Sequence, residues 1–176
     1  LFDWAVIGLC VYAAQTLNHL VFSLFAIITI GARQHALFVM IHEAAHYHIS
    51  NRKWLNNWTS DLLCALPLFF DTDVYRKNHL QHHRFLNSDQ DPDWIRKVDR
   101  PEWTFPMSWT KLIGITASYL TLKGPLEWAQ ILWRFSGLGS QERWRQQPSF
   151  LIFKIFYFGS LLSLCYAGGH LKHVLM

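Results

Sequence analysis

The sequence begins with a long apolar segment that contains no charged side chain from Trp4 to Ala32. About 20 consecutive apolar residues are enough for a helix to cross the hydrocarbon core of a bilayer, so this segment predicts a membrane span. Polar residues in its middle leave open whether it forms one long helix or the end of one helix followed by a second: Gln15, Thr16, Asn18 and His19. A cleaved signal peptide fits less well, because no basic residue precedes the segment, no small-residue cleavage pattern is present and the run is too long.

The composition agrees with a membrane protein. Hydrophobic residues make up 51% of the chain and charged residues only 16%, whereas soluble domains carry about 25% charged residues. The formal net charge of +4 is unevenly distributed, because no Lys or Arg precedes Arg33. These features exclude a disordered or nucleic-acid-binding tail. The three cysteines, Cys10, Cys64 and Cys165, are widely spaced among apolar residues and predict neither a disulfide framework nor a cysteine-based metal site.

The rest of the chain predicts further helices separated by polar segments. We expect a helix from Gly31 to Ser50, an interfacial helix from Trp54 to Phe70, a water-exposed loop from Asn78 to Met107, two short surface helices within Leu112–Leu138 that separate at Gly124-Pro125, and a second span from Ser149 to Gly169. The predicted fold class is all-α: an integral membrane helical bundle with a histidine-rich helical cap. Residues 1–176 form one domain in this interpretation, and the apolar sequence at both ends suggests a domain that is truncated at both.

Five of the ten histidines gather in two short motifs. The first, His42-Glu43-Ala44-Ala45-His46, places two imidazoles one helical turn apart on the same face, as a shared metal ion requires. For an isolated pair the alternative would be two neighbouring histidines at a membrane surface. The presence of a second motif makes the metal site the better interpretation.

The second motif, His79-Leu80-Gln81-His82-His83, gathers three imidazoles toward one side if the segment is helical. Burying so many imidazoles without partners would be costly, so the motif indicates a metal site or an extended hydrogen-bond network. The competing interpretation is a basic, headgroup-binding patch that also includes Arg76, Lys77 and Arg84.

The remaining histidines are weaker candidates. His35 lies on the same helical face as His42 and is either an outer ligand or an interfacial polar residue, whereas His48 points elsewhere. We expect His19 to be a buried, hydrogen-bonded side chain. His170 and His173 follow the second span and are expected to face water far from both motifs.

The ligand types alone leave the metal open. The first motif also has the HExxH pattern of zinc peptidases, in which the two histidines bind zinc and the glutamate, here Glu43, acts as general base. Five imidazoles exceed what one catalytic zinc ion with three protein ligands can use, which favours two metal ions. Imidazole suits iron as well as zinc.

The order of the two motifs resembles the membrane fatty acid desaturase and hydroxylase superfamily, in which HExxH is followed by HxxHH between membrane spans. The resemblance is close from Trp4 to about Trp94 and extends to the residues that flank the motifs. These are Gly31-Ala32-Arg33-Gln34, Asn51-Arg52-Lys53-Trp54-Leu55-Asn56, Tyr75-Arg76-Lys77-Asn78 and Asp89-Gln90-Asp91-Pro92-Asp93.

The resemblance implies a non-haem di-iron enzyme that uses O2 to desaturate or hydroxylate a lipid chain. Its iron ligands would be His42, His46, His79, His82 and His83, and Glu43 would orient one of these histidines. Electrons would come from a partner such as a ferredoxin or a cytochrome, because the chain contains no flavin or haem motif and no cysteine cluster. The third histidine box of the family has no counterpart here, since His170 and His173 have the spacing HxxH at the wrong topological position.

Both motifs must lie on one face of the membrane to share metal ions, so the segment between them cannot cross it an odd number of times. The positive-inside bias places the histidine-rich cap in the cytosol, because basic residues lie beside the motifs: Arg33, Arg52, Lys53, Arg76, Lys77 and Arg84. Two alternatives to the di-iron enzyme stay open, a membrane zinc peptidase and a metal-free membrane interaction module.

Overall fold

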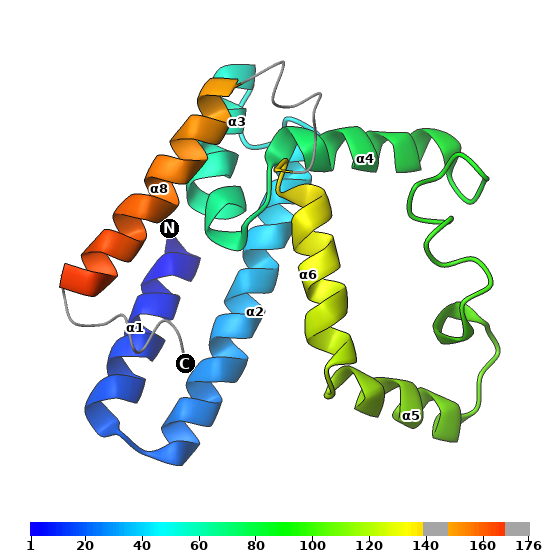
Figure 1. Ribbon diagram of the computed structural model, residues 1–176, viewed down its shortest axis with the longest axis horizontal. Helices are drawn as coiled ribbons and strands as arrows, with labels where there is room; N and C mark the ends of the chain where they lie inside the picture. The colour runs from blue at the N-terminus through cyan, green and yellow to red at the C-terminus, as the bar shows by residue number, and fades with distance from the viewer. Residues whose placement is uncertain (139–147, 168–176) are drawn as a thin grey trace.

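A computed structural model of the protein describes residues 1–138 and 148–167, and every regular element among these residues is a helix (Figure 1). The predicted all-α fold is therefore confirmed for the described part of the chain. His170, His173 and the expected end of the second span at Gly169 lie outside the described residues.

The charge-free N-terminal segment folds into two helices that form an antiparallel hairpin (Figure 1). α1 covers Phe2–Leu17 and α2 covers Leu20–Ala45. Between them Asn18 takes a left-handed conformation with φ 42°, and His19 caps α2 by accepting the backbone N–H of Val21 at Nδ1, 3.3 Å away. The sequence did not decide whether this segment forms one helix or two, and the structure has two. His19, which we expected to be buried, is exposed at this turn.

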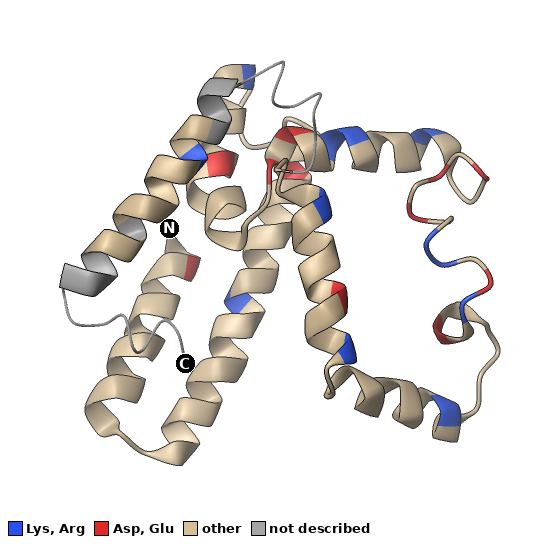
Figure 2. Ribbon diagram, in the orientation of Figure 1, with Lys and Arg blue, Asp and Glu red and all other residues tan. Residues whose placement is uncertain are grey.

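α2 is long and apolar enough to cross a membrane, and it is the only helix of the described residues that meets both conditions. Large apolar side chains on it are exposed, among them Phe25, Ile27 and Ile28. The end of the hairpin far from the histidines carries no charged residue (Figure 2). A helix that is apolar on all sides without being buried in protein is typical of a membrane span. α8, Pro148–Ala167, forms a helix where the second span was expected, and its crossing of a membrane stays a prediction.

The segment between the two histidine motifs forms three short helical pieces instead of one helix from Trp54 to Phe70. α3 covers Lys53–Ser60, the π-helical turn η1 covers Asp61–Ala65 and the 3-10 turn η2 covers Leu66–Leu68. The helical path ends there because Pro67 has no N–H to donate and Phe69 is left-handed, with φ 61°.

α4, Thr72–Phe85, carries the second histidine motif. Asp71 caps its first turn by accepting the backbone N–H groups of Asp73 and Val74, both at 3.0 Å. The expected loop is therefore wrong for residues 78–85, which contain no helix breaker. The irregular chain begins at Leu86 and runs to Ser108, interrupted by one 3-10 turn, η3, at Pro101–Trp103.

α5, Trp109–Tyr119, and α6, Lys123–Phe135, agree with the expectation of two short helices, but they separate at residues 120–122 and not at Gly124-Pro125. Pro125 is tolerated in the first turn of α6 because its missing N–H would have no intrahelical partner there. Gly124 is required by close packing, since a Cβ atom at this position would lie 2.3 Å from the carbonyl oxygen of Tyr119.

A small apolar core holds these elements together and contains Leu37, Ile41, Cys64, Ala65, Phe70 and Phe135. The ring of Phe70 stacks on that of Phe135 with centroids 5.3 Å apart, and Phe38 stacks on Trp128 at 5.7 Å. The backbone N–H of Asp71 also donates to the carbonyl oxygen of Phe135 at 2.8 Å. These contacts fix the start of α4 and the end of α6 to the second half of α2. Cys10 and Cys64 are free thiols, and Cys64 is buried in this core.

Candidate metal centre

The first histidine motif occupies the end of α2. His42 lies in the helix and His46 is its C-cap residue, and their ring centroids are 5.0 Å apart. The helix stops before the expected Ser50 because Tyr47 adopts a left-handed conformation with φ 62°. The last carbonyl groups of a helix have no intrahelical partner and need other donors.

Two buried side chains from α3 and α4 supply these donors. Arg76 donates from Nη2 to the carbonyl oxygen of Ala44 (2.8 Å) and from Nε to that of Ala45 (3.1 Å), and Asn56 donates to Ala44 (2.9 Å). Arg76 thereby ties α4, which carries the second motif, to the end of the helix that carries the first. Because Arg76 is buried, it cannot belong to the exposed headgroup-binding patch considered as an alternative.

The second motif lies on α4, where His79 and His83 are one turn apart with ring centroids separated by 4.5 Å. Tyr75, one turn earlier, stacks on His79 with the ring planes inclined by 12° and the centroids 5.4 Å apart. His79 is buried, whereas His83 is exposed. Packing by Tyr75 therefore fixes the inner imidazole of this pair.

Nitrogen atoms from the two motifs converge. Nε2 of His79 lies 2.9 Å from Nε2 of His46 and 3.0 Å from Nε2 of His83. One ring nitrogen from each of four histidines lies within 4.8 Å of the others: His42, His46, His79 and His83. Two nitrogens bound at a right angle to one metal ion, each about 2.1 Å from it, would be about 3 Å apart. The donor set and its spacing therefore fit a metal ion.

The protonation state of His79 also suits metal binding. Burial lowers the pKa of this imidazole, and repulsion from His42, His83 and His46 lowers it further, to about 4. At neutral pH His79 is therefore uncharged and keeps the lone pair that a metal ligand needs.

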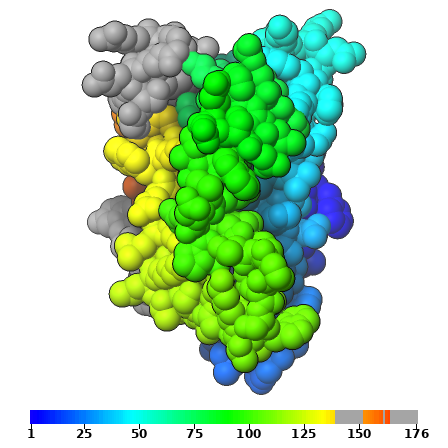
Figure 3. Space-filling view, turned by 90° about the vertical axis from the view of Figure 1, so that its right-hand side faces the viewer, coloured from blue at the N-terminus to red at the C-terminus, as the bar shows by residue number. Residues whose placement is uncertain are grey.

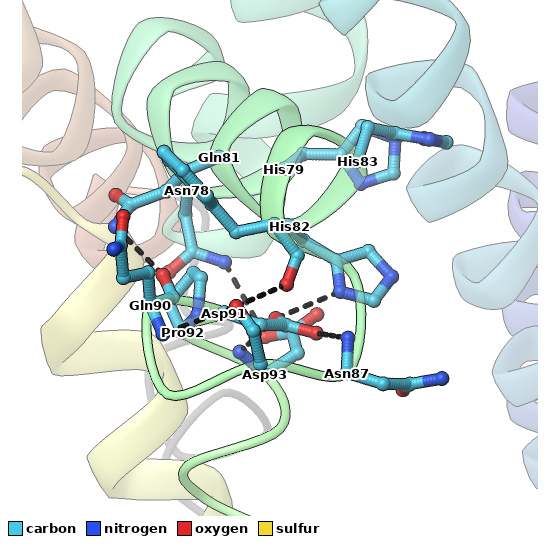
Figure 4. A network of polar contacts seen from close by, with 12 residues as sticks. Asn78, His79, Gln81, His82, His83, Asn87, Gln90, Asp91, Pro92 and Asp93 are labelled. Atoms are coloured by element: carbon cyan, nitrogen blue, oxygen red, sulfur yellow. Dashed lines mark hydrogen bonds and ion pairs between the residues drawn. The ribbon is translucent and has the colours of Figure 1, made fainter.

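His82 is not part of the four-nitrogen group. Its ring centroid lies 6.3 Å from that of His79, and its Nδ1 lies 2.8 Å from Oδ1 of Asp91 (Figure 4). Asp91 is fully buried and also accepts the backbone N–H groups of Asn87 (2.9 Å) and Asp93 (2.8 Å). Burial raises the pKa of the Asp91 carboxyl, but these hydrogen bonds outweigh burial and hold the pKa well below its usual range. A charged Asp91 keeps the proton of His82 on Nδ1 and leaves its Nε2 with a free lone pair.

Glu43 lies between two imidazoles. Its Oε1 is 3.0 Å from Nδ1 of His42, and its Oε2 is 2.9 Å from Nδ1 of His48. Both carboxylate oxygens are thus engaged, and Nε2 of His42 is left to act as a ligand atom. His48, which the sequence analysis set aside, belongs to this network, and its ring also stacks on His46 at 5.6 Å.

Asp91 and Arg76 stand in the flanking motifs quoted for the family resemblance, but the sequence analysis gave neither of them a role in the metal centre. Asp91 follows His82 across a turn that no periodicity predicts, and the bonds by which Arg76 ties α4 to α2 go to backbone carbonyl groups, which no residue pattern marks. His35 is exposed and lies outside the four-nitrogen group.

Comparisons with known proteins agree with this geometry. The fatty acid desaturase family matches residues 17–176. The dihydrorhizobitoxine desaturase of Bradyrhizobium elkanii is 30% identical over 191 residues, covering 99% of this chain and 51% of that protein. An sn-1 oleoyl-lipid 12-desaturase of Picosynechococcus sp. is 27% identical over 126 residues, covering 68% of this chain and 34% of that protein. The chain thus spans about half the length of the first relative and about a third of the second. No solved structure matches. The chain belongs to the fatty acid desaturase family.

Proposed function

We propose that the protein containing this chain is a membrane-bound non-haem di-iron oxygenase that desaturates or hydroxylates the acyl chain of a lipid. It would use O2 and electrons from an external donor such as a ferredoxin or a cytochrome. The observation that carries the proposal is the convergence of imidazoles from α2 and α4 within 4.8 Å. Iron bound there would supply the O2 activation needed to remove hydrogen from an unactivated C–H bond.

Five histidines are assigned as iron ligands in this proposal. Four are those whose nitrogens converge: His42, His46, His79 and His83. His82 would bind a second iron ion through Nε2 while Asp91 holds its Nδ1. Five imidazoles are too few to complete the coordination of two iron ions, so we propose that further ligands come from outside residues 1–176.

Glu43 would act by orienting His42 rather than by taking a proton from water. A general base of a zinc peptidase needs an oxygen that faces the water bound to the metal. Both oxygens of Glu43 instead contact Nδ1 atoms, one of His42 and one of His48. This arrangement supports the oxygenase over the peptidase.

The charge distribution supports a cytosolic location for the histidines. The hairpin end opposite to them carries no Lys or Arg, whereas basic residues lie on α3 and α4 beside the motifs (Figure 2). Positive residues are retained preferentially on the cytosolic side of a membrane.

Elemental analysis of the intact protein tests the metal assignment. The proposal predicts close to two iron ions per protein chain and little zinc. One zinc ion without iron would instead support the peptidase, and the absence of any stoichiometric metal would support a metal-free interaction module.

Single substitutions test the ligands. We expect His79→Ala, His82→Ala and His83→Ala each to eliminate lipid oxidation and to lower the iron content, because each removes a ligand nitrogen. His35→Ala is the matched control, since it removes an exposed imidazole of α2 outside the group. Near-normal activity of any two of the three variants would refute the ligand assignment.

Glu43→Gln separates the two enzyme classes. The loss of an orienting partner should weaken iron affinity by about 10- to 100-fold. In a peptidase the same change would abolish turnover and leave the metal content intact.

A further inference from the structure

A cavity of about 390 Å³ lies away from the histidines, between the chain that follows α4 and the helices α5 and α6. Four cationic side chains line it: Arg96, Lys97, Arg100 and Arg134. Figure 3 shows this side of the molecule, with the green segment that follows α4 between α6 in yellow and α2 in blue. The wall of this cavity also contains one carboxylate, Glu127, and the ring of Trp103.

Three of the four cations in this cavity form no ion pair within the described part of the chain. Arg96 is paired with Asp93 at 2.5 Å. Lys97 lies over the ring of Trp103, 4.8 Å from its centroid, and Arg134 donates to the neutral side-chain oxygen of Asn78 at 2.5 Å. Among residues 1–138 and 148–167 no carboxylate forms an ion pair with Lys97, Arg100 or Arg134.

The cations also act on one another. The pKa of Arg134 is lowered by desolvation of its guanidinium and by the positive charge of Arg96, and Asp93 offsets this only in part. A bound anion would relieve this repulsion. Guanidinium groups bind the oxygens of phosphate in a bidentate manner, which makes phosphate a suitable anion for a cavity with three arginines.

An apolar cavity of about 320 Å³ adjoins the first and shares Tyr119, Glu127 and Ile131 with it. Pro125 and Trp128 line its other side. The two cavities together offer a cationic compartment beside an apolar one, which matches an anionic amphiphile better than a free anion.

Exposed apolar side chains on α5 and on its connection to α6 point to the same class of ligand. Leu120 and Leu122, which join α5 to α6, are 88% and 78% exposed, and Trp109 and Ile113 of α5 are 79% and 65% exposed. Exposed apolar groups of this size next to basic residues are typical of a surface that contacts lipid.

We infer that the cationic cavity binds the headgroup of an anionic, phosphate-bearing lipid, with the glycerol and acyl part of that lipid over the apolar cavity. The proposed function does not specify a headgroup. This inference rests on the proposed function only where the bound lipid is taken to be the substrate. Asn78 connects the cavity to the metal centre, because it accepts from Arg134 and directly precedes His79. A headgroup held by Arg134 would therefore lie beside the helix that carries the second histidine motif.

The test is an equilibrium binding measurement on the full-length protein in a non-ionic detergent after removal of metal. Dioleoylphosphatidylglycerol should bind at least tenfold more tightly than dioleoylphosphatidylcholine, which has the same chains and no net charge. Dioleoylglycerol should bind no better than phosphatidylcholine. Inorganic phosphate should displace phosphatidylglycerol only at far higher concentration than the lipid itself.

Substitutions locate the site. Arg100→Gln and Arg134→Gln should each weaken phosphatidylglycerol binding by about fivefold, the effect of one basic residue beside an anionic lipid. Arg134→Gln also loses the contact with Asn78, which Arg100 does not make, so Arg100→Gln tests the cavity independently of that contact. Arg52→Gln is the matched control, because Arg52 is exposed at the start of α3 and does not line the cavity.

Equal binding of phosphatidylglycerol and phosphatidylcholine, or equal effects of the cavity variants and Arg52→Gln, would overturn the inference. Binding of inorganic phosphate as tight as that of the lipid would overturn the lipid part of it. The binding measurement uses metal-free protein and requires no turnover. A negative result therefore contradicts this inference alone, whereas iron analysis and lipid oxidation test the proposed function.

Discussion

The carboxylate of Asp91 serves both the chain that follows α4 and the imidazole of His82. It is fully buried, accepts backbone N–H groups of Asn87 and Asp93, and contacts Nδ1 of His82. The same hydrogen bonds that order the turn therefore keep the carboxylate charged and aimed at the ring. A loop carboxylate can in this way determine which histidine nitrogen is presented to a metal.

Asp91→Asn should lower the affinity of the intact protein for iron by about 10- to 100-fold, because the amide is a weaker partner for the Nδ1 proton of His82. Iron retention against increasing chelator measures this effect, and thermal unfolding measured in parallel reports any loss of the turn. Asp99→Asn, an exposed position of the same segment with φ 60°, is the matched control. Iron retention by Asp91→Asn equal to that of the control would contradict the orienting role.

Asp61 is a second buried carboxylate with a different effect. Burial raises its pKa to about 6, and the charges of Asp71 and Asp73 raise it as well, whereas hydrogen bonds from Thr72 lower it. The folded pKa lies above the unfolded value near 3.8, so this group binds more protons in the folded state between about pH 4 and pH 6. Its contribution to the free energy of unfolding is therefore most favourable below pH 4 and decreases as the pH rises to 6.

Asp61→Asn should remove this pH dependence and stabilise the protein at pH 7, by at most about 3 kcal/mol for a shift of about two pKa units. Asn keeps the Oδ1 acceptor for the backbone N–H of Thr72, which lies 3.1 Å away. The free energy of unfolding is measured in detergent from pH 4 to pH 7.5 for the variant and for the parent protein. The titration of the histidines is common to both and cancels in the difference. Asp89→Asn, at an exposed position, is the control, and parallel curves for parent and Asp61→Asn would refute the assignment.

At the level of the elements, hydropathy and histidine spacing were sufficient to predict a helix around the first motif, because a period of 3.6 residues is a local property. For the second motif the spacing predicted only that the imidazoles would share one side if the segment were helical. Hydropathy and spacing marked the polar residues around Asn18 but did not decide whether the helix breaks there, because the break depends on the left-handed conformation of Asn18. They placed the second motif in a water-exposed loop from Asn78 to Met107, whereas α4 continues to Phe85. The contact between His82 and Asp91 depends on how the intervening turn folds, which local spacing does not specify.

Arg76 shows most clearly how a contact between elements positions the centre. Besides its bonds to the carbonyl groups of Ala44 and Ala45, its guanidinium donates to Asn57 at 2.7 Å and lies over the ring of Tyr47 at 4.2 Å. The planar, multiply donating guanidinium makes these contacts together, which a lysine ammonium cannot do.

Arg76→Lys should therefore destabilise the protein by about 1.5 to 3 kcal/mol, the range for hydrogen bonds to a charged group, although the charge is kept. Iron retention should fall together with stability, because α2 and α4 lose their shared anchor. Arg84→Lys on the same helix is the matched control, since Arg84 is exposed. Equal unfolding midpoints for the two variants would show that Arg76 does not hold the helices together.

At the scale of the whole molecule, the histidines and the turn at Asn18 lie at opposite ends of α2 (Figure 1). With 26 residues and a rise of 1.5 Å per residue, α2 is about 39 Å long, which exceeds the roughly 30 Å hydrocarbon core of a bilayer. If α2 crosses the membrane, the two ends must therefore face different compartments.

Cysteine labelling of the full-length protein tests this topology. In a background without other cysteines, Leu17→Cys at the hairpin turn should react with a membrane-impermeant maleimide in intact cells. Ser88→Cys, in the segment after α4, should react only after permeabilisation, because the basic residues beside the motifs retain that side in the cytosol. Leu17 is the last residue of α1 and Ser88 lies in the segment after α4, and both side chains are exposed. The reverse pattern would place the histidines outside the cytosol, and equal labelling of both positions in intact cells would show that α2 does not cross the membrane.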